Sequence, residues 1–115
     1  MSEIKELLQK INKFIIDREW DQFQNPKDLA ISLALESAEV LEHFQWKNGD
    51  ELRDYLASDK NKIADELADV FIYLLNLSAR LGVDLVEAAH NKIEKNALKY
   101  PINKSKGNAK KYNEL

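Results

Sequence analysis

Two stretches of this chain are apolar at helical spacing, and each carries a pair of carboxylates within the apolar run. Residues 26–44 contain Glu36 and Glu39, and residues 59–81 contain Glu66 and Asp69. Side chains three residues apart lie on the same face of an α-helix. Each stretch therefore predicts a helix with an acidic stripe on an otherwise apolar surface. Two such helices are expected to pack together, because packing buries their apolar sides.

Cap and turn residues separate these two helices from the rest of the chain. Asn25 followed by Pro26 is typical of a helix start, and Gly82 is typical of a residue just after a helix end. Asp84 caps the last helix, which is expected to stop before Pro101. The expected helices span about residues 2–19, 26–44, 50–57, 59–81 and 84–100.

The scarcity of turn-forming residues favours a helical protein. The chain has 3 glycines and 2 prolines among 115 residues, too few for a sheet with many turns. We expect an all-α, four-helix-bundle-like protomer and a single domain over residues 1–115, with residues 102–115 as a loosely ordered basic tail. The two central helices are apolar enough to bury a face against another copy, so a homodimer or homotetramer is expected.

Several classes of protein and site are excluded or disfavoured. There is no cysteine, so the chain has neither a disulfide nor a thiolate metal site. No apolar run approaches the roughly 20 residues of a membrane span. The N-terminal sequence MSEIKELLQK carries acids, unlike a signal peptide. We expect a cytoplasmic protein without a membrane partner, and the net charge of −3 argues against duplex nucleic acid as a partner.

The two acidic pairs suggest a metal site. If the two central helices pack antiparallel, Glu36, Glu39, Glu66 and Asp69 converge. Clustered carboxylates repel one another unless a cation lies among them or some are protonated. Mg²⁺ takes oxygen ligands and commonly binds through carboxylates together with substrate phosphates. An acidic stripe can also be a solvated helix face, and spacing alone leaves both interpretations open.

A basic stripe and two tryptophans suit a phosphorylated aromatic ligand. Lys92, Lys95 and Lys99 share one face of the last helix, and lysine is a suitable point-charge partner for phosphate. Trp20 and Trp46 flank the first acidic helix, and flat side chains can stack on a nucleobase. The alternatives are a solvated lysine face and tryptophans in the core or at a subunit contact.

Longer blocks of sequence resemble a known family. Glu36-x-x-Glu39 followed by Glu66-x-x-Asp69 resembles the metal motif of the MazG-like all-α nucleoside triphosphate pyrophosphohydrolases, closest to the dCTP pyrophosphatase branch. The blocks NPKDLAISLALESAEVLEHFQW, DELADVFIYLLNLSARLGVDL and KNALKYP also resemble that branch. Together with REWDQF, they extend the similarity over nearly the whole chain from Arg18 onward.

The resemblance implies an activity and a set of site residues. It implies hydrolysis of a (deoxy)nucleoside triphosphate to the monophosphate and pyrophosphate, for nucleotide-pool clean-up, with a pyrimidine deoxynucleotide such as dCTP favoured. Mg²⁺ would be the cofactor, with Mn²⁺ able to substitute, and pockets would form between protomers. The metal ligands and catalytic residues would be Glu36, Glu39, Glu66 and Asp69. The substrate-binding residues would be Trp20, Trp46, Tyr73, Asn76, Lys95, Asn96, Lys99 and Tyr100.

The chain departs from the family pattern in two places. The family often has glycines around the first acidic pair, where this chain has Leu35, Ser37 and Ala38. That difference is expected to affect packing and not metal ligation. After DQF the branch often has histidine, and this chain has Gln24. Gln24 would belong to the nucleotide-facing loop, so the base preference is left open.

Two other functions fit parts of the pattern. A carboxylate-bridged di-iron bundle uses two Glu-x-x-His motifs, and this chain has one, from Glu87 to His90. A non-catalytic helical interaction module would use the same apolar faces and bind no metal at the acids.

Overall fold

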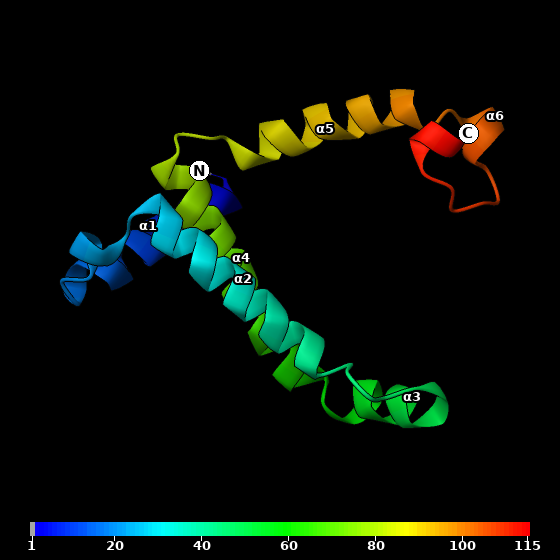
Figure 1. Ribbon diagram of the computed structural model, residues 1–115. Helices are drawn as coiled ribbons and strands as arrows, with labels where there is room; N and C mark the ends of the chain where they lie inside the picture. Colours follow the sequence, from blue (N-terminus) through cyan, green and yellow to red (C-terminus); the bar gives the residue numbers. More distant parts are fainter. Residues whose placement is uncertain (1) are drawn as a thin grey trace. The chain divides into compact units, whose positions relative to one another are not determined.

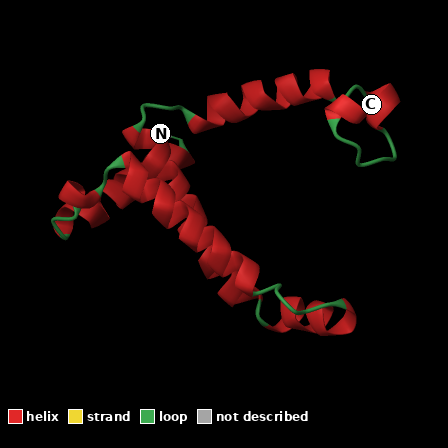
Figure 2. Cartoon of the chain, viewed as in Figure 1, coloured by secondary structure: helices red, strands yellow, loops and turns green. Residues whose placement is uncertain are grey.

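A computed structural model describes residues 2–115, and all regular secondary structure in that range is helical (Figure 2). The all-α prediction is confirmed. The chain divides into two compact units, one ending at Gly82 and the other spanning Val83–Leu115, and each is described by itself. The first unit contains α1 (Glu3–Asp17), the 3₁₀ segment η1 (Asp21–Phe23), α2 (Pro26–Glu42), α3 (Gly49–Ser58) and α4 (Lys60–Arg80).

The first unit is built on α2 and α4, which run antiparallel and side by side (Figure 1). These are the two apolar helices with acidic stripes, so their expected pairing is confirmed. Leu29 of α2 is 2% exposed and Leu75 of α4 is 1% exposed, which places both in the core. Helices α1 and α3 also pack against α4, and α1 contributes Ile11 and Ile15 to the core.

Two helix starts follow the caps expected from the sequence, Asn25 and Asp84, and Ser2 caps α1 in the same way. The side chains of Ser2, Asn25 and Asp84 each accept a hydrogen bond from the backbone N–H three residues later, at 3.2, 2.9 and 3.1 Å. Such bonds satisfy donors that a helix leaves unpaired in its first turn. Gly82 follows the end of α4 with φ of +69°, a conformation that glycine adopts without steric cost.

The expected end of the second helix is wrong by two residues, since α2 stops at Glu42 and not at Phe44. The backbone N–H of Phe44 bonds to the carbonyl of Leu41, three residues back, so the α-helical pattern gives way to a tighter turn. The link to α3 then contains Trp46 at φ of +69°. Helix α3 begins at Gly49, one residue before the expected start, with φ of +55° at that glycine.

The second unit contains α5 (Leu85–Lys99), α6 (Ile102–Ser105) and a 3₁₀ segment, η2 (Tyr112–Glu114). The rings of Tyr100 and Tyr112 meet edge to face with centroids 6.3 Å apart. The ammonium of Lys99 lies 4.9 Å from the centre of the Tyr112 ring. Residues 102–115 therefore include two short helical segments, and the expectation of loose order in this tail stays a prediction.

Much apolar surface of the central helices is exposed. Ile31 and Leu35 of α2 are 52% and 62% exposed, and Leu67 and Phe71 of α4 are 52% and 41% exposed. Even so, none of the helices formed by residues 2–115 has the length and apolar character needed to cross a membrane.

Candidate active site

The antiparallel pairing of α2 and α4 brings three of the four predicted acids together. Glu36 and Glu39 project from α2 and Glu66 from α4, and one carboxylate oxygen of each lies within 4.8 Å of the others. We call these three side chains the acidic cluster. The cluster forms because the i, i+3 spacing on α2 faces the matching stripe on α4.

Two oxygens of the acidic cluster are buried without a partner. Oε2 of Glu36 and Oε2 of Glu66 are inaccessible to solvent and make no hydrogen bond with residues 2–115. Both side chains are half-buried, whereas Glu39 is exposed. A buried polar atom without a partner is costly, so these two oxygens are candidate ligands for a cation.

Burial and neighbouring acids raise the pKa values in the cluster. Burial, a hydrogen bond with Glu39 and the charges of Glu39, Asp69 and Glu66 raise the pKa of Glu36 to about 6. The pKa of Glu66 is raised by a hydrogen bond with Glu39, by burial and by the charges of Glu39 and Asp69. A cation would relieve this repulsion and supply the missing partners. The all-oxygen donor set fits a hard divalent ion.

A cavity of about 440 Å³ adjoins the acidic cluster, within the first unit. Its wall contains both acidic and aromatic side chains, so it can take a ligand with charged and flat parts. Asp69, which lies outside the group of three, lines this cavity together with Glu36. The other lining residues are Leu7, Lys10, Ile11, Phe14, Ile15, Trp20, Gln24, Ile72, Tyr73 and Asn76.

Three of the predicted substrate-binding residues line the cavity, and six of its other lining residues were not predicted. The three predicted residues that line it are Trp20, Tyr73 and Asn76. Lys10 and Phe14 of α1 also line it, and neither was among the predicted site residues. Phe14 lies at helical spacing with Ile11 and Ile15, a pattern typical of packing residues, and only the tertiary structure places it in a cavity wall. The ring of Phe14 meets Trp20 edge to face at 5.8 Å.

The other predicted binding residues lie elsewhere. Trp46 is 86% exposed and does not line the cavity. It follows the end of α2, whereas Trp20 precedes the start of that helix. Lys95, Asn96, Lys99 and Tyr100 belong to α5 and its C-terminal cap, in the second unit.

Two polar contacts hold the segment that carries Trp20. The Nδ2 of Asn76 donates a hydrogen bond of 2.7 Å to Oε1 of Gln24. One turn further along α4, the guanidinium of Arg80 donates a bond of 2.7 Å to the carboxylate of Asp21. Both contacts join the segment between α1 and α2 to α4.

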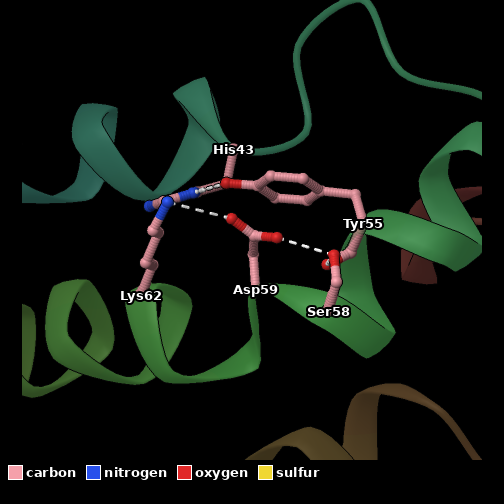
Figure 3. Close-up of polar contacts among 5 residues, drawn as sticks. All are labelled: His43, Tyr55, Ser58, Asp59 and Lys62. Atoms are coloured by element: carbon pink, nitrogen blue, oxygen red, sulfur yellow. Dashed lines mark hydrogen bonds and ion pairs between the residues drawn. The ribbon is translucent and has the colours of Figure 1, made fainter.

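A second polar group lies where α2, α3 and α4 meet (Figure 3). His43 Nδ1 shares a hydrogen bond with the hydroxyl of Tyr55. The carboxylate of Asp59 accepts bonds from the hydroxyl of Ser58 at 2.6 Å and from the ammonium of Lys62 at 3.1 Å. These two bonds hold the pKa of Asp59 below its usual range. We call these five residues the junction cluster.

Neither histidine belongs to the acidic cluster among the described residues. His43 is engaged with Tyr55, and Glu87 and His90 lie on α5 in the second unit. The second Glu-x-x-His motif that a di-iron site would need is missing from the sequence. The geometry therefore gives no support to the di-iron alternative.

Comparisons with known proteins agree with the fold and show the family. The model of the MazG-like family matches residues 31–115. Over 105 residues the chain is 40% identical to dCTP pyrophosphatase 1 of Mus musculus and 36% identical to that of Homo sapiens. Each alignment covers 90% of this chain and 62% of the relative, so the chain spans about three fifths of the length of these relatives.

A solved structure is similar over nearly its full length. It is a pyrophosphatase from Archaeoglobus fulgidus DSM 4304, with a TM-score of 0.83 and 40% sequence identity. The superposition covers 88% of this chain and 94% of that one. At this level of identity the likeness extends beyond the general fold.

Proposed function

The chain belongs to the MazG-like family, and we propose that it hydrolyses a nucleoside triphosphate to the monophosphate and pyrophosphate. One observation carries this proposal. Three carboxylates from two antiparallel helices converge within 4.8 Å, two of their oxygens lack partners, and a cavity with an aromatic wall adjoins them. Such a site has a place for a cation, for phosphate oxygens bound to it and for a base.

Glu36, Glu39 and Glu66 would hold Mg²⁺, and Asp69 stands close enough to add its charge. Asp69 raises the pKa of both Glu36 and Glu66, so its charge reaches the cluster. A bound Mg²⁺ neutralises phosphate charge and lowers the pKa of an attacking water. The same oxygen ligands suit Mn²⁺. The four acids act together as the catalytic group, because phosphoryl transfer depends mainly on positioning and charge stabilisation.

The base would lie in the cavity against Trp20. Its indole is 46% exposed and lies in the cavity wall, so one ring face can stack on a base. Along α4, Asn76 and Asp69 are seven residues apart, which is about 10 Å at the rise of an α-helix. That length suits a nucleoside with its base near Asn76 and its α-phosphate near the acids. We take dCTP as the preferred substrate because relatives at 36–40% identity are dCTP pyrophosphatases.

The family resemblance would assign phosphate binding to the lysines of α5. Lys92, Lys95 and Lys99 are all exposed and recur at helical spacing, so their ammonium groups share a face. Asn96 and Tyr100 would assist on the adjoining side. A cationic stripe stabilises the charge that accumulates on the β and γ phosphates as the α–β bond breaks.

A second copy of the chain would complete the site. Ile31, Leu35, Leu67 and Phe71 are each more than 40% exposed on the central helices, and apolar surface of this extent favours burial in an interface. The exposed Trp46 would then reach the base pocket of a neighbouring protomer. We expect a homodimer or homotetramer.

The deciding experiment identifies the products formed from dCTP in the presence of Mg²⁺. dCMP and pyrophosphate are expected, whereas dCDP and orthophosphate would refute the proposal. Glu39→Gln should lower turnover by roughly 10²-fold or more. Glu42→Gln is the matched control, because Glu42 is an exposed acid on the same helix outside the acidic cluster.

A further inference from the structure

The cavity contains a linked pair of side-chain amides. Asn76 of α4 is 4% exposed, and its Nδ2 donates the 2.7 Å hydrogen bond to Oε1 of Gln24. Both side chains line the cavity beside Trp20. The two residues are 52 positions apart in the chain, so the pair exists only because the segment before α2 folds back onto α4.

Gln24 is held in place from both sides along the chain. Its backbone N–H bonds to the carbonyl of Asp21 at 3.2 Å, and the side chain of Asp21 is tied to Arg80. On its other side, Asn25 caps α2. The Gln24 amide is therefore presented to the cavity from an anchored backbone.

The bond between the two amides leaves one donor group and one acceptor wholly free for a ligand. A carboxamide carries an NH₂ donor and an oxygen acceptor. With Asn76 Nδ2 bonded to Gln24 Oε1, the groups left wholly free are the Gln24 NH₂ and the Asn76 oxygen, and the two bonded groups keep one N–H and one lone pair. Within residues 2–115, neither amide makes another side-chain hydrogen bond.

Rotating both amides by half a turn preserves their mutual bond and exchanges the free groups. The Gln24 NH₂ then donates to the Asn76 oxygen, leaving the Gln24 oxygen and the Asn76 NH₂ for a ligand. In one orientation Gln24 offers a donor and Asn76 an acceptor to a ligand, and in the other orientation Gln24 offers the acceptor and Asn76 the donor. No third side chain of the described residues fixes one orientation.

The two orientations match the two kinds of pyrimidine edge. Cytosine presents an acceptor at N3 and a donor at its 4-amino group, whereas uracil presents a donor at N3 and an acceptor at O4. We propose that the Gln24–Asn76 pair reads this edge of the base, and that its reversal lets one pocket accept both 4-amino and 4-keto pyrimidine nucleotides. The inference rests on the proposed function for the placement of the base.

The test compares kcat/KM for dCTP and dUTP in the unaltered protein and in Gln24→Met, which keeps the side-chain length and removes both hydrogen-bonding groups. The unaltered protein should use both substrates within about tenfold of each other. Gln24→Met should lose roughly tenfold on each, as expected for lost hydrogen bonds to a base. The loss should appear in KM, and an abasic deoxyribose triphosphate should be hydrolysed as before.

Gln22→Met is the matched control in the same segment. The Gln22 side chain donates to the carbonyl of Glu19 at 3.1 Å and does not line the cavity. It should leave both KM values unchanged. A preference of more than about a hundredfold for either pyrimidine, or equal losses on the abasic substrate in Gln24→Met, would overturn the inference.

Direct binding separates this inference from the proposed activity. Calorimetric titration with dCMP and dUMP should give similar affinities, weakened by Gln24→Met and unaffected by Gln22→Met. If both monophosphates bind in this way and no triphosphate is cleaved, the proposed function fails and the inference stands. If neither binds while dCTP is cleaved, the inference fails and the function stands.

Discussion

The acidic cluster lies between α2 and α4, and the junction cluster lies where α3 joins the same two helices. The carboxylates of the two clusters have opposite pKa shifts. In the junction cluster Asp59 has two donors, and its pKa is lowered. In the acidic cluster Glu36 and Glu66 have buried oxygens without donors, and their pKa values are raised. A carboxylate with hydrogen-bond donors from the protein, such as Asp59, needs no bound cation. Buried carboxylates without partners, with raised pKa values, mark the acidic cluster as the candidate site for a bound cation.

The largest expected effect follows from removing one acid of the unpaired cluster. Glu39→Gln should lower kcat for dCTP by roughly 10²-fold or more, because changes even to groups that support a metal ligand cost 10–100-fold. The metal-free variant should be at least as stable as the parent, since it loses repulsion. Thermal melts in chelator check this second part. A clear drop in melting temperature there would indicate that Glu39 is a structural carboxylate like Asp59.

Magnesium should stabilise the parent and not the variant. A ligand that binds only the folded state adds about 2.7 kcal/mol to the free energy of unfolding when its concentration is 100 times its dissociation constant. Chemical denaturation with and without Mg²⁺ measures this gain. It should largely disappear in Glu39→Gln and persist in Glu42→Gln. An equal response in all three proteins would place the ion somewhere other than the acidic cluster.

The acidic cluster should give metal-free protein an unusual pH dependence. Because the pKa of Glu36 rises from 4.5 unfolded to about 6 folded, the folded state binds more protons between those values. The free energy of unfolding should therefore fall by up to about 2 kcal/mol as pH rises through this window. Asp59, with a lowered pKa, contributes the opposite slope, and its effect lies at lower pH, below its unfolded value of 3.8.

Denaturation in chelator at pH 4.5 and pH 6.5 measures this difference. Glu36→Gln should flatten the dependence, because the titrating carboxyl is gone. A parent protein whose stability rises with pH across the window would contradict the assignment of repulsion to this cluster.

The smallest expected effect belongs to the junction cluster. Here a substitution should lower stability and leave activity unchanged, the opposite of the result expected for Glu39→Gln. Tyr55→Phe removes the hydroxyl that bonds to His43, and the loss of one such bond costs about 1 kcal/mol of stability. Activity per folded molecule should be unchanged, because neither residue lines the cavity. Melting temperature and kcat measured on the same preparation separate the two. A fall in kcat without a fall in stability would extend the active site to the junction cluster.

Local patterns predicted the helices and the acidic stripes well, because both depend on residues close in sequence. Asn25 and Asp84 cap helices as expected, and the i, i+3 spacing placed Glu36 and Glu39 on one face. The same spacing suggested four equivalent acids. Only the register of α2 against α4 shows that Glu66 joins the group of three while Asp69 lines the cavity beside it.

Contacts between distant residues were not predictable from one sequence. No local sequence pattern predicts that Gln24 bonds to Asn76, or that His43 bonds to Tyr55. Trp20 and Trp46 looked equivalent because both flank the same helix. Only the fold shows that Trp20 lines the cavity, whereas Trp46 is exposed outside it.

If Trp46 stacks on the base of a neighbouring protomer's substrate as proposed, its backbone conformation sets thermal stability against ligand recognition. A bulky residue at φ of +69° is strained, and such strain costs on the order of 1 kcal/mol or more. Glycine would adopt the same conformation without steric cost. A directed-evolution campaign that rewards heat resistance alone would therefore favour Trp46→Gly. One that rewards substrate capture through this indole would retain the tryptophan and its strain.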